Sequence, residues 1–296
     1  YDLILKAAAS DASVIIFGES GSGKELVARA IHRLSDRCDG QFIPVNCGAI
    51  PKGLMEREFF GHLKGAFTGA GADKGGFLDS ADGGTLFLDE IGEIGQEMQV
   101  KLLRVLDGVG YSPLGGTTPK KSDFRVIAAT NRDLVKLVKD GHMREDFFYR
   151  IRILPIQLPP LRERKEDIPL LIDHFLSTLT KGSESPKHIP VRIREAMETY
   201  GWPGNVRELQ NVLHTYMTLG KLELMGQISV DTHGVALAPE DLELGGQGLR
   251  QRIGAMEKKM ILNALERSHW HRGKAAELLQ LNYKTLQRKM KAHGIK

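Results

Sequence analysis

Residues 14–24, Val-Ile-Ile-Phe-Gly-Glu-Ser-Gly-Ser-Gly-Lys, decide the fold of this chain. The four leading apolar residues predict a buried strand, and Glu25 to Leu34 place apolar side chains at helical spacing. A strand, a glycine loop and a helix are the context of a phosphate-binding loop, although an ordinary glycine-rich turn has the same outline. Backbone N–H groups of such a loop hold phosphate oxygens, and a lysine adds a mobile cation. We therefore predict nucleotide binding by Gly18, Glu19, Ser20, Gly21, Ser22, Gly23, Lys24, Glu25 and Leu26.

A second strand pattern, Gly-Thr-Leu-Phe-Leu-Asp-Glu at residues 84–90, ends in two carboxylates. Beside a phosphate loop, this pair suits nucleoside triphosphate hydrolysis: Asp89 would hold Mg²⁺ through its waters, and Glu90 would polarise the attacking water. Position 25 is Glu, where a Ser or Thr hydroxyl usually reaches the metal. Mg²⁺ binding is therefore expected to depend on Asp89, Glu90 and water, and Lys24, Asp89 and Glu90 are predicted to be catalytic.

Two further strands are predicted at Phe42–Asn46 and Phe124–Ala129. Pro44 cannot donate to a ladder, so the first of these strands belongs near an edge. Each strand ends in a polar residue, and we expect Asn131 beside the γ-phosphate; Asn46 either faces the same site or caps a turn. Strands that deliver polar residues at their carboxyl ends predict a parallel α/β sheet with helices on both faces.

Two segments outside the phosphate loop are candidates for contacts with other molecules. Gly-Ala-Phe-Thr-Gly-Ala at residues 65–70 offers one large side chain, so we expect a protruding loop that displays Phe67 to a partner, or a Phe67 that folds back onto its own domain. Arg144 and Arg150 flank an aromatic cluster. They are candidates to act on a neighbouring subunit's nucleotide, the alternative being an ion pair with Glu145 or Asp146.

Pro159 and Pro160 end the sheet-forming part, and helical patterns follow. Asn205 and Glu208 have the spacing of a capping box. Arg207 would then lie in a first helical turn, where the macrodipole disfavours a cation unless the cation points at phosphate. We predict four segments: an α/β nucleotide-binding part at 1–160, a helical lid at 161–228, a linker at 229–250 and a DNA-binding part at 251–296.

Charge is distributed unevenly along the chain. Residues 249–296 hold 12 Lys and Arg against 3 Asp and Glu, whereas the remainder holds 29 against 34. Helical spacing in this basic part predicts three short helices, the third running over residues 283–293 with Asn282 as its cap. A helix-turn-helix is expected, with a plain three-helix cap as the alternative. The side chains predicted to face DNA are Lys284, Thr285, Gln287, Arg288 and Lys291.

The bulk composition is that of a globular protein, with 41% hydrophobic and 26% charged residues among 296. No apolar run approaches the length of a membrane span, so we expect a cytoplasmic protein without a membrane partner. Cys38 and Cys47 match no metal-ligand spacing and are expected to be free thiols.

Several of these motifs together resemble one family. Residues 18–25, 65–70, 86–90, 201–209 and 275–291, with Arg144 and Arg150, resemble the NtrC-type bacterial enhancer-binding proteins, AAA+ ATPases that activate RNA polymerase carrying sigma-54. The hexapeptide at 65–70 is the most specific of them, and Glu25 is usual in this family. The resemblance implies an AAA+ core, a helical lid and a C-terminal all-α Fis-type helix-turn-helix domain.

The resemblance also implies the activity. ATP and Mg²⁺ are the cofactors, Asn131 and Arg207 are nucleotide sensors, and Arg144 and Arg150 act in trans within a hexameric or heptameric ring. Sigma-54 contacts fall on Gly65, Ala66, Phe67, Thr68, Gly69 and Ala70. The protein would remodel closed promoter complexes of sigma-54 RNA polymerase from upstream double-stranded enhancer DNA, bound by dimeric DNA-binding domains.

Three points remain open at this level. A DNA-binding regulator that uses the AAA+ fold only for assembly, or a protein unfoldase, would share much of the pattern. His271 and Gly273 stand where Asn and Thr are common, so the second helix of the DNA-binding part is expected to be less firmly capped. The receiver or ligand-sensing domain usual in this family, often part of a two-component system, is not visible in these residues.

Overall fold

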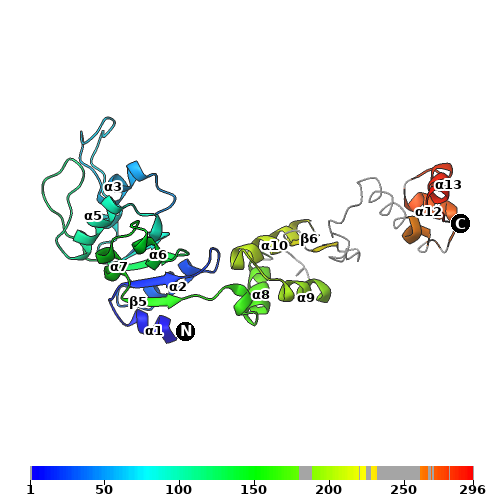
Figure 1. The fold of residues 1–296 in the computed structure, drawn as a ribbon, viewed down its shortest axis with the longest axis horizontal. Helices are drawn as coiled ribbons and strands as arrows, with labels where there is room; N and C mark the ends of the chain where they lie inside the picture. Colours follow the sequence, from blue (N-terminus) through cyan, green and yellow to red (C-terminus); the bar gives the residue numbers. More distant parts are fainter. Residues whose placement is uncertain are drawn as a thin grey trace. The chain divides into compact units, whose positions relative to one another are not determined.

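A computed structural model describes residues 2–179, 189–219, 221–224, 228–231, 261–265, 268, 270–279 and 281–295. The chain divides into two compact units, Tyr1–Val235 and Ala236–Lys296 (Figure 1). Among the described residues, no helix combines the length and the apolar character needed to cross a bilayer.

The described residues of the first unit build a five-stranded sheet in the order β2-β3-β4-β1-β5, and all four pairings are parallel. Its strands are β1 (Val14–Phe17), β2 (Phe42–Asn46), β3 (Thr85–Asp89), β4 (Arg125–Thr130) and β5 (Leu154–Gln157). The edge position predicted for β2 from Pro44 is confirmed, because only an edge strand tolerates the missing donor. The predicted parallel α/β fold is confirmed as well.

Helices cover both faces of the sheet (Figure 1). On one face, Val14 and Ile16 pack with α1 (Asp2–Ala8) and α2 (Lys24–Arg33). On the other face, Ile15 and Leu88 pack with α3 (Lys52–Phe60), α5 (Gln96–Leu106) and α7 (Glu145–Ile151). The remaining elements of this part are α4 (Phe77–Ser80), η1 (Ile91–Glu93) and α6 (Leu134–Lys139).

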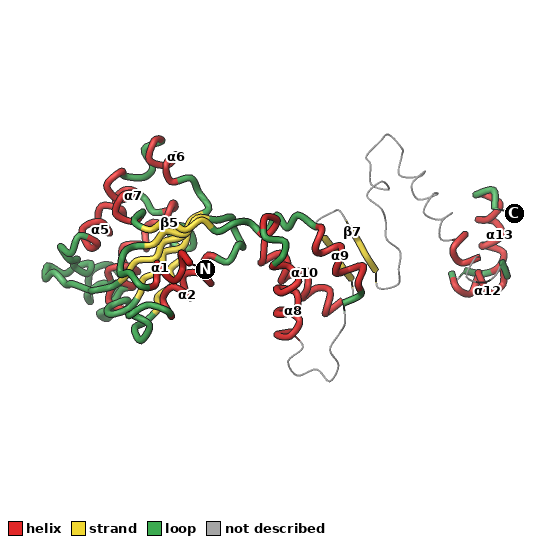
Figure 2. Tube along the Cα trace, turned by 90° about the horizontal axis from the view of Figure 1, so that it is seen from below, coloured by secondary structure: helices red, strands yellow, loops and turns green. Residues whose placement is uncertain are grey.

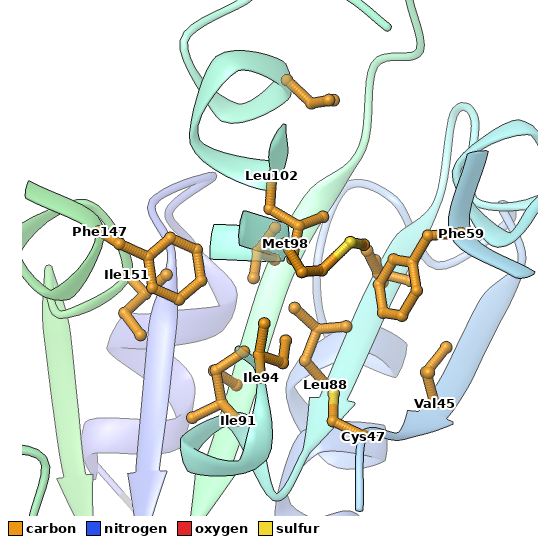
Figure 3. Packing of buried hydrophobic residues seen from close by; sticks show 14 of the residues in the cluster. Val45, Cys47, Phe59, Leu88, Ile91, Ile94, Met98, Leu102, Phe147 and Ile151 are labelled. Carbon is orange, nitrogen blue, oxygen red and sulfur yellow. The ribbon is translucent and has the colours of Figure 1, made fainter. Parts of the chain in front are cut away.

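The larger core lies between the sheet and α3, α5 and α7. Figure 3 shows Met98 and Leu102 of α5 with Phe59, Phe147 and Ile151 over the strand residues Val45 and Leu88. Full burial of one such side chain stabilises the fold by about 1.5–3 kcal/mol. This packing fixes the carboxyl ends of β1, β3 and β4 relative to one another.

The apolar pattern of α2 predicts only some of the side chains that the helix buries. Ala28 and Ile31 are buried against the sheet, whereas Leu26 and Leu34 are 69% and 56% exposed. Leu26 therefore lies next to the phosphate loop as an exposed apolar side chain and takes no part in the core.

The lid packs three helices together, α8 (Asp167–Leu179), α9 (Val191–Thr199) and α10 (Asn205–Leu219), after the short η2 (Leu161–Glu163) (Figure 2). Trp202 is fully buried between α9 and α10, and its Nε1 donates to the Met197 carbonyl at 2.8 Å. An antiparallel hairpin of β6 (Lys221–Leu224) and β7 (Ile228–Asp231) follows. The linker expected at 229–250 is therefore wrong for its first three residues, and residues 232–250 lie outside the described part.

The second unit contains a helical stretch at 261–265, α12 (Arg272–Leu278) and α13 (Tyr283–Ala292). Ile261, Leu265, Ala275, Leu286 and Met290 form its core. The predicted cap of α13 is confirmed, because Asn282 Oδ1 accepts from the Thr285 N–H at 2.8 Å. Residues 251–260, where the first of the three predicted helices would begin, lie outside the described residues.

The start of α12, expected to be less firmly capped, has a side-chain cap whose hydrogen bond is longer than that of Asn282. His271 precedes the helix, and its Nδ1 accepts from the Lys274 N–H at 3.2 Å. An imidazole nitrogen thus accepts the N–H hydrogen bond that an Asn or Ser oxygen accepts at other helix starts.

Candidate nucleotide site and adjoining loops

The loop between β1 and α2 has the backbone of a phosphate-binding loop. Gly21 and Gly23 have φ values of 73° and 101°, in the left-handed region that favours glycine. Lys24 Nζ donates to the carbonyls of Gly18 at 3.0 Å and Glu19 at 3.1 Å, inside the curve of the loop. Burial lowers the pKa of Lys24, and the carboxylates of Asp89 and Glu90 oppose that shift. The ammonium group therefore lies within electrostatic reach of both predicted catalytic carboxylates.

Asp89 and Glu90 stand at the carboxyl end of β3, as predicted. Asp89 Oδ1 accepts from the Glu90 N–H at 2.9 Å, and Glu90 has φ 55°, which costs a residue with a Cβ about 1 kcal/mol or more. The Glu90 carboxylate lies so close to Gly48 that a methyl group there would collide with it. Asn46 Oδ1 accepts from the Ala49 N–H at 2.9 Å, which is the turn-capping alternative.

Asn131 reaches the same edge of the sheet. The Gly18 N–H donates to the Thr130 carbonyl at 3.2 Å, so the exposed Asn131 follows directly beside the start of the phosphate loop. The structure thus brings Lys24, Asp89, Glu90 and Asn131 to one edge from β1, β3 and β4. A bound nucleoside triphosphate with Mg²⁺ fits this set, because Mg²⁺ needs only one or two protein carboxylates beside phosphate oxygens and water.

The lid contacts the phosphate loop at four successive residues. Arg207 Nη1 donates to Ser20 Oγ at 3.1 Å, which places the predicted sensor at the loop. The Gly21 carbonyl accepts from the N–H groups of Val206 at 3.0 Å and Arg207 at 3.3 Å. Arg164 donates to the Ser22 carbonyl at 2.7 Å. A methyl group at Gly21 would collide with the Gly204 carbonyl. The contact with the lid therefore requires glycine at this position, in addition to the predicted contact with phosphate.

Glu19 is the fourth of these residues, and its side chain faces the lid. Its two carboxylate oxygens accept from Arg162 at 2.6 and 2.8 Å, and Asn205 Nδ2 adds a bond at 3.0 Å. The hydrogen bonds from Arg162 and then Asn205 lower the pKa of Glu19 to about 2. The expectation that Glu19 belongs to the nucleotide-binding set is thus modified, because its carboxylate is engaged by protein donors.

The predicted capping box at Asn205 is wrong. Asn205 has φ 55°, and its Oδ1 accepts from the Leu161 N–H at 2.8 Å. Glu208 instead accepts from the Gly204 N–H at 2.7 Å, one residue earlier than the box requires. Sequence reasoning missed Arg162, Arg164 and Asn205 as partners of the phosphate loop, and no local spacing could have paired them with residues so far away.

Arg144 and Arg150 have partners on their own chain. Arg144 pairs with Asp146 at 2.7 Å, which is one of the predicted alternatives, and this bond lowers the pKa of Asp146. Arg150 pairs with Asp107 at 3.2 Å and donates to the Leu106 carbonyl, both at the end of α5. Both guanidinium groups remain almost half exposed.

The hexapeptide forms a closed loop on a paired stem (Figure 1). His62 and Lys74 exchange two backbone hydrogen bonds of 2.9 Å, and the Gly65 N–H donates to the Ala70 carbonyl at 2.9 Å. Phe67 is half-buried, 5.0 Å from the His62 ring and 5.4 Å from the Arg57 guanidinium. The expectation of a displayed Phe67 does not hold in this structure, because these two side chains cover the ring; Thr68 is exposed.

A second loop, residues 107–122, is attached to that stem. The Leu63 N–H donates to the Leu114 carbonyl at 2.9 Å, and the Leu114 N–H donates to the Gly61 carbonyl at 3.0 Å. A methyl group at Gly115 would meet the Ala66 side chain at 2.8 Å. The two loops therefore pack as one structure.

The predicted DNA-facing residues lie on α13. Lys284, Gln287, Arg288 and Lys291 are exposed, and Thr285 is half-buried. The same helix buries Leu286 and Met290. This helix therefore has a basic face opposite its apolar one.

Known families match the chain in three successive parts. The Sigma-54 interaction domain matches residues 1–157, more than half of the chain. The chain belongs to the sigma-54 activator family. The AAA+ ATPase lid domain matches residues 162–233, and the bacterial regulatory protein family Fis matches residues 252–293.

Three relatives of this chain illustrate the match. Nitrogen fixation protein AnfA of Azotobacter vinelandii is 42% identical over 100% of this chain and 55% of AnfA. Response regulator protein PilR of Pseudomonas aeruginosa is 43% identical over 98% of this chain and 66% of PilR. The crystal structure of NtrX from Brucella abortus in complex with ATP covers 99% of this chain and 66% of NtrX, with 32% identity and a TM-score of 0.68. The chain thus spans between about half and two thirds of these relatives.

Proposed function

We propose that this chain is the ATP-hydrolysing and DNA-binding part of a transcriptional activator that remodels closed promoter complexes of sigma-54 RNA polymerase from an upstream enhancer. The observation that carries the proposal is the meeting of Lys24, Asp89 and Glu90 at one sheet edge, on a chain that also carries the 65–70 loop. The sigma-54 interaction domain match and the ATP complex of NtrX support it. The cytoplasm is where its DNA and polymerase partners would be met.

Each residue of the site has a proposed role. The loop N–H groups of residues 18–24 and Lys24 bind the phosphates, and Asp89 holds Mg²⁺ through its waters. Glu90 polarises the attacking water. Asn131 and Arg207 would respond to the terminal phosphate of ATP, which hydrolysis removes. Leu26, exposed beside the loop, would contact the nucleotide.

This proposal requires two sets of side chains to leave their present contacts. Phe67 must leave Arg57 and His62 before it can meet sigma-54 beside Thr68. Arg144 and Arg150 must leave Asp146 and Asp107 before they can reach a neighbour's nucleotide in a hexameric or heptameric ring. The two ion pairs are almost half exposed and are each worth at most about 1 kcal/mol, and the half-buried Phe67 contact with Arg57 is worth about 0.5–2 kcal/mol, so ATP binding can drive these exchanges.

Replacement of the exposed Thr68 by Ala tests the role of the loop. Thr68→Ala should abolish sigma-54-dependent transcription in a reconstituted assay while leaving ATP turnover close to wild type, since Thr68 lies on the loop and not at the sheet edge. Lys24→Ala is the reference that should lose both activities. An equal loss of transcription and hydrolysis in Thr68→Ala would count against the loop role. Wild-type hydrolysis at background would favour a regulator that uses the fold only for assembly.

A further inference from the structure

A glutamate inside a phosphate loop is electrostatically unfavourable. An ionised carboxylate has no hydrogen to donate and repels phosphate oxygens. Glu19 nevertheless stands between Gly18 and Ser20, and its backbone carbonyl is one of the two that hold Lys24. The side chain therefore calls for a partner other than the nucleotide, and the lid supplies it.

Two separate segments of the lid converge on this one carboxylate. Arg162 belongs to η2, directly after the proline pair at the junction, and Asn205 is the first residue of α10. The three bonds to Glu19 measure 2.6, 2.8 and 3.0 Å. Asn205 is fully buried and also accepts from the Leu161 N–H, so it joins η2 to α10 at the same place. An isolated ion pair on one exposed helix would not connect two segments of the chain in this way.

The position of Arg207 depends on this anchor. Asn205 Nδ2 also donates to the Ser20 carbonyl at 3.1 Å, and the next two N–H groups of α10 donate to the Gly21 carbonyl. Arg207 is therefore two residues from Asn205 on a helix end that the phosphate loop holds. If Glu19 released Asn205 and Arg162, the first turn of α10 would lose the Asn205 bond to the Glu19 carboxylate, and η2 would lose its ion pair with the loop.

We propose that Glu19 is a positioning residue that latches the lid to the phosphate loop through Arg162 and Asn205 and thereby sets where Arg207 stands. This latch rests on the proposed role of Arg207 toward the nucleotide. Glu19 itself touches no phosphate. Its charge is balanced by Arg162, which removes the repulsion that an unpaired carboxylate would exert on a bound nucleotide.

Amide hydrogen exchange of the intact, nucleotide-free chain tests the latch directly. Glu19→Ala and Arg162→Ala should each speed exchange at the first turn of α10, where the amides of Val206 and Arg207 donate to Gly21, by about three- to ten-fold. Glu19→Gln keeps an acceptor for Asn205 and should fall between Glu19→Ala and the wild type. The double variant Glu19→Ala with Arg162→Ala should be no faster than the faster single variant.

A matched control exists within the lid. Asp173 pairs with Arg194 at 2.7 Å, and both side chains lie outside the phosphate-loop contacts. Asp173→Asn removes a similar exposed ion pair and should leave exchange at α10 unchanged. Wild-type exchange in Glu19→Ala, or additive effects of the two single variants, would overturn the latch.

Nucleotide affinity gives an independent reading. With a fluorescent, non-hydrolysable ATP analogue as the probe, Glu19→Ala should raise Kd by about three- to ten-fold, with Glu19→Gln intermediate. Lys24→Ala is the reference for a disabled loop. If the wild type binds the probe no better than Lys24→Ala, the proposed nucleotide function fails, and the exchange result still decides the latch because it needs no nucleotide. Unchanged Kd in Glu19→Ala alongside tight wild-type binding would overturn the effect on Arg207.

Discussion

At the level of single residues, the two cysteines differ most sharply in their surroundings. Cys47 is 1% exposed near the proposed catalytic carboxylates, and burial, with Asp89 and Glu90 nearby, raises its pKa to about 12. Cys38 is exposed. Iodoacetamide at pH 8 should therefore alkylate Cys38 alone, because only thiolates react and Cys47 is both protonated and covered.

Peptide mass spectrometry checks this prediction. Alkylation of Cys47 should require denaturant, and the denatured chain is the control that both thiols can be labelled. Native labelling of Cys47 at the rate of Cys38 would show that the end of β3 opens far more readily than the packing implies.

Site residues could be predicted from sequence where a local pattern fixes their place. Lys24, Asp89, Glu90 and Asn131 each follow a strand, and parallel strands deliver such residues to one edge. The partners of Glu19 could not be predicted, because Arg162 lies 143 residues away and meets it only through tertiary packing. Sequence alone does not decide whether Phe67 is displayed or folded back, because tertiary packing brings Arg57 and His62 against its ring.

At the level of single elements, the Asn282 cap controls the start of the predicted DNA-contacting helix. Asn282→Ala should destabilise α13 by about 1 kcal/mol, because the Thr285 N–H loses its acceptor. Amide exchange measured across α13 in the intact chain should then become about five-fold faster.

Asn282→Ser is the control for this cap, since a serine hydroxyl can accept the same bond. It should exchange at nearly the wild-type rate. Equal acceleration in the serine and alanine variants would mean that the side chain of Asn282 does something other than cap the helix.

The elements also differ in how far sequence alone predicts them. Four of the five strands of the sheet were predicted from their apolar runs, and Pro44 even assigned β2 to an edge; no range was predicted for β5. The hairpin of β6 and β7 was missed, because two four-residue strands give too short a pattern to separate from a linker. The acceptor that caps α12 could not be predicted, because His271 is an unusual acceptor at a helix start.

At the level of the whole molecule, the proposed ring of subunits can be tested with mixtures of two variants. Arg144→Ala subunits should lack the arginine that acts on a neighbour, and Glu90→Gln subunits should lack the residue that polarises water. Mixed rings contain some junctions with both residues intact, so they should hydrolyse more ATP than either variant alone.

Native mass spectrometry must confirm that the mixed rings form. Arg194→Ala subunits, which lose a comparable exposed ion pair within the lid, should hydrolyse ATP unaided. Mixed rings without any recovery would assign Arg144 to its own chain, where it already pairs with Asp146.

The shared stem of the two long loops limits how the loop at 65–70 can travel. Leu114 holds the loops together by two backbone hydrogen bonds, one to Leu63 and one to Gly61, and Gly115 lies against Ala66. Separating them would forfeit roughly 1–3 kcal/mol. In the proposed mechanism, a movement of the 65–70 loop driven from the sheet edge would therefore carry the 107–122 loop with it, and that loop begins at the end of α5 with Asp107, the partner of Arg150. In the proposed ring, a force at a subunit junction that pulls Arg150 away from Asp107 would then act on the base of the paired loops.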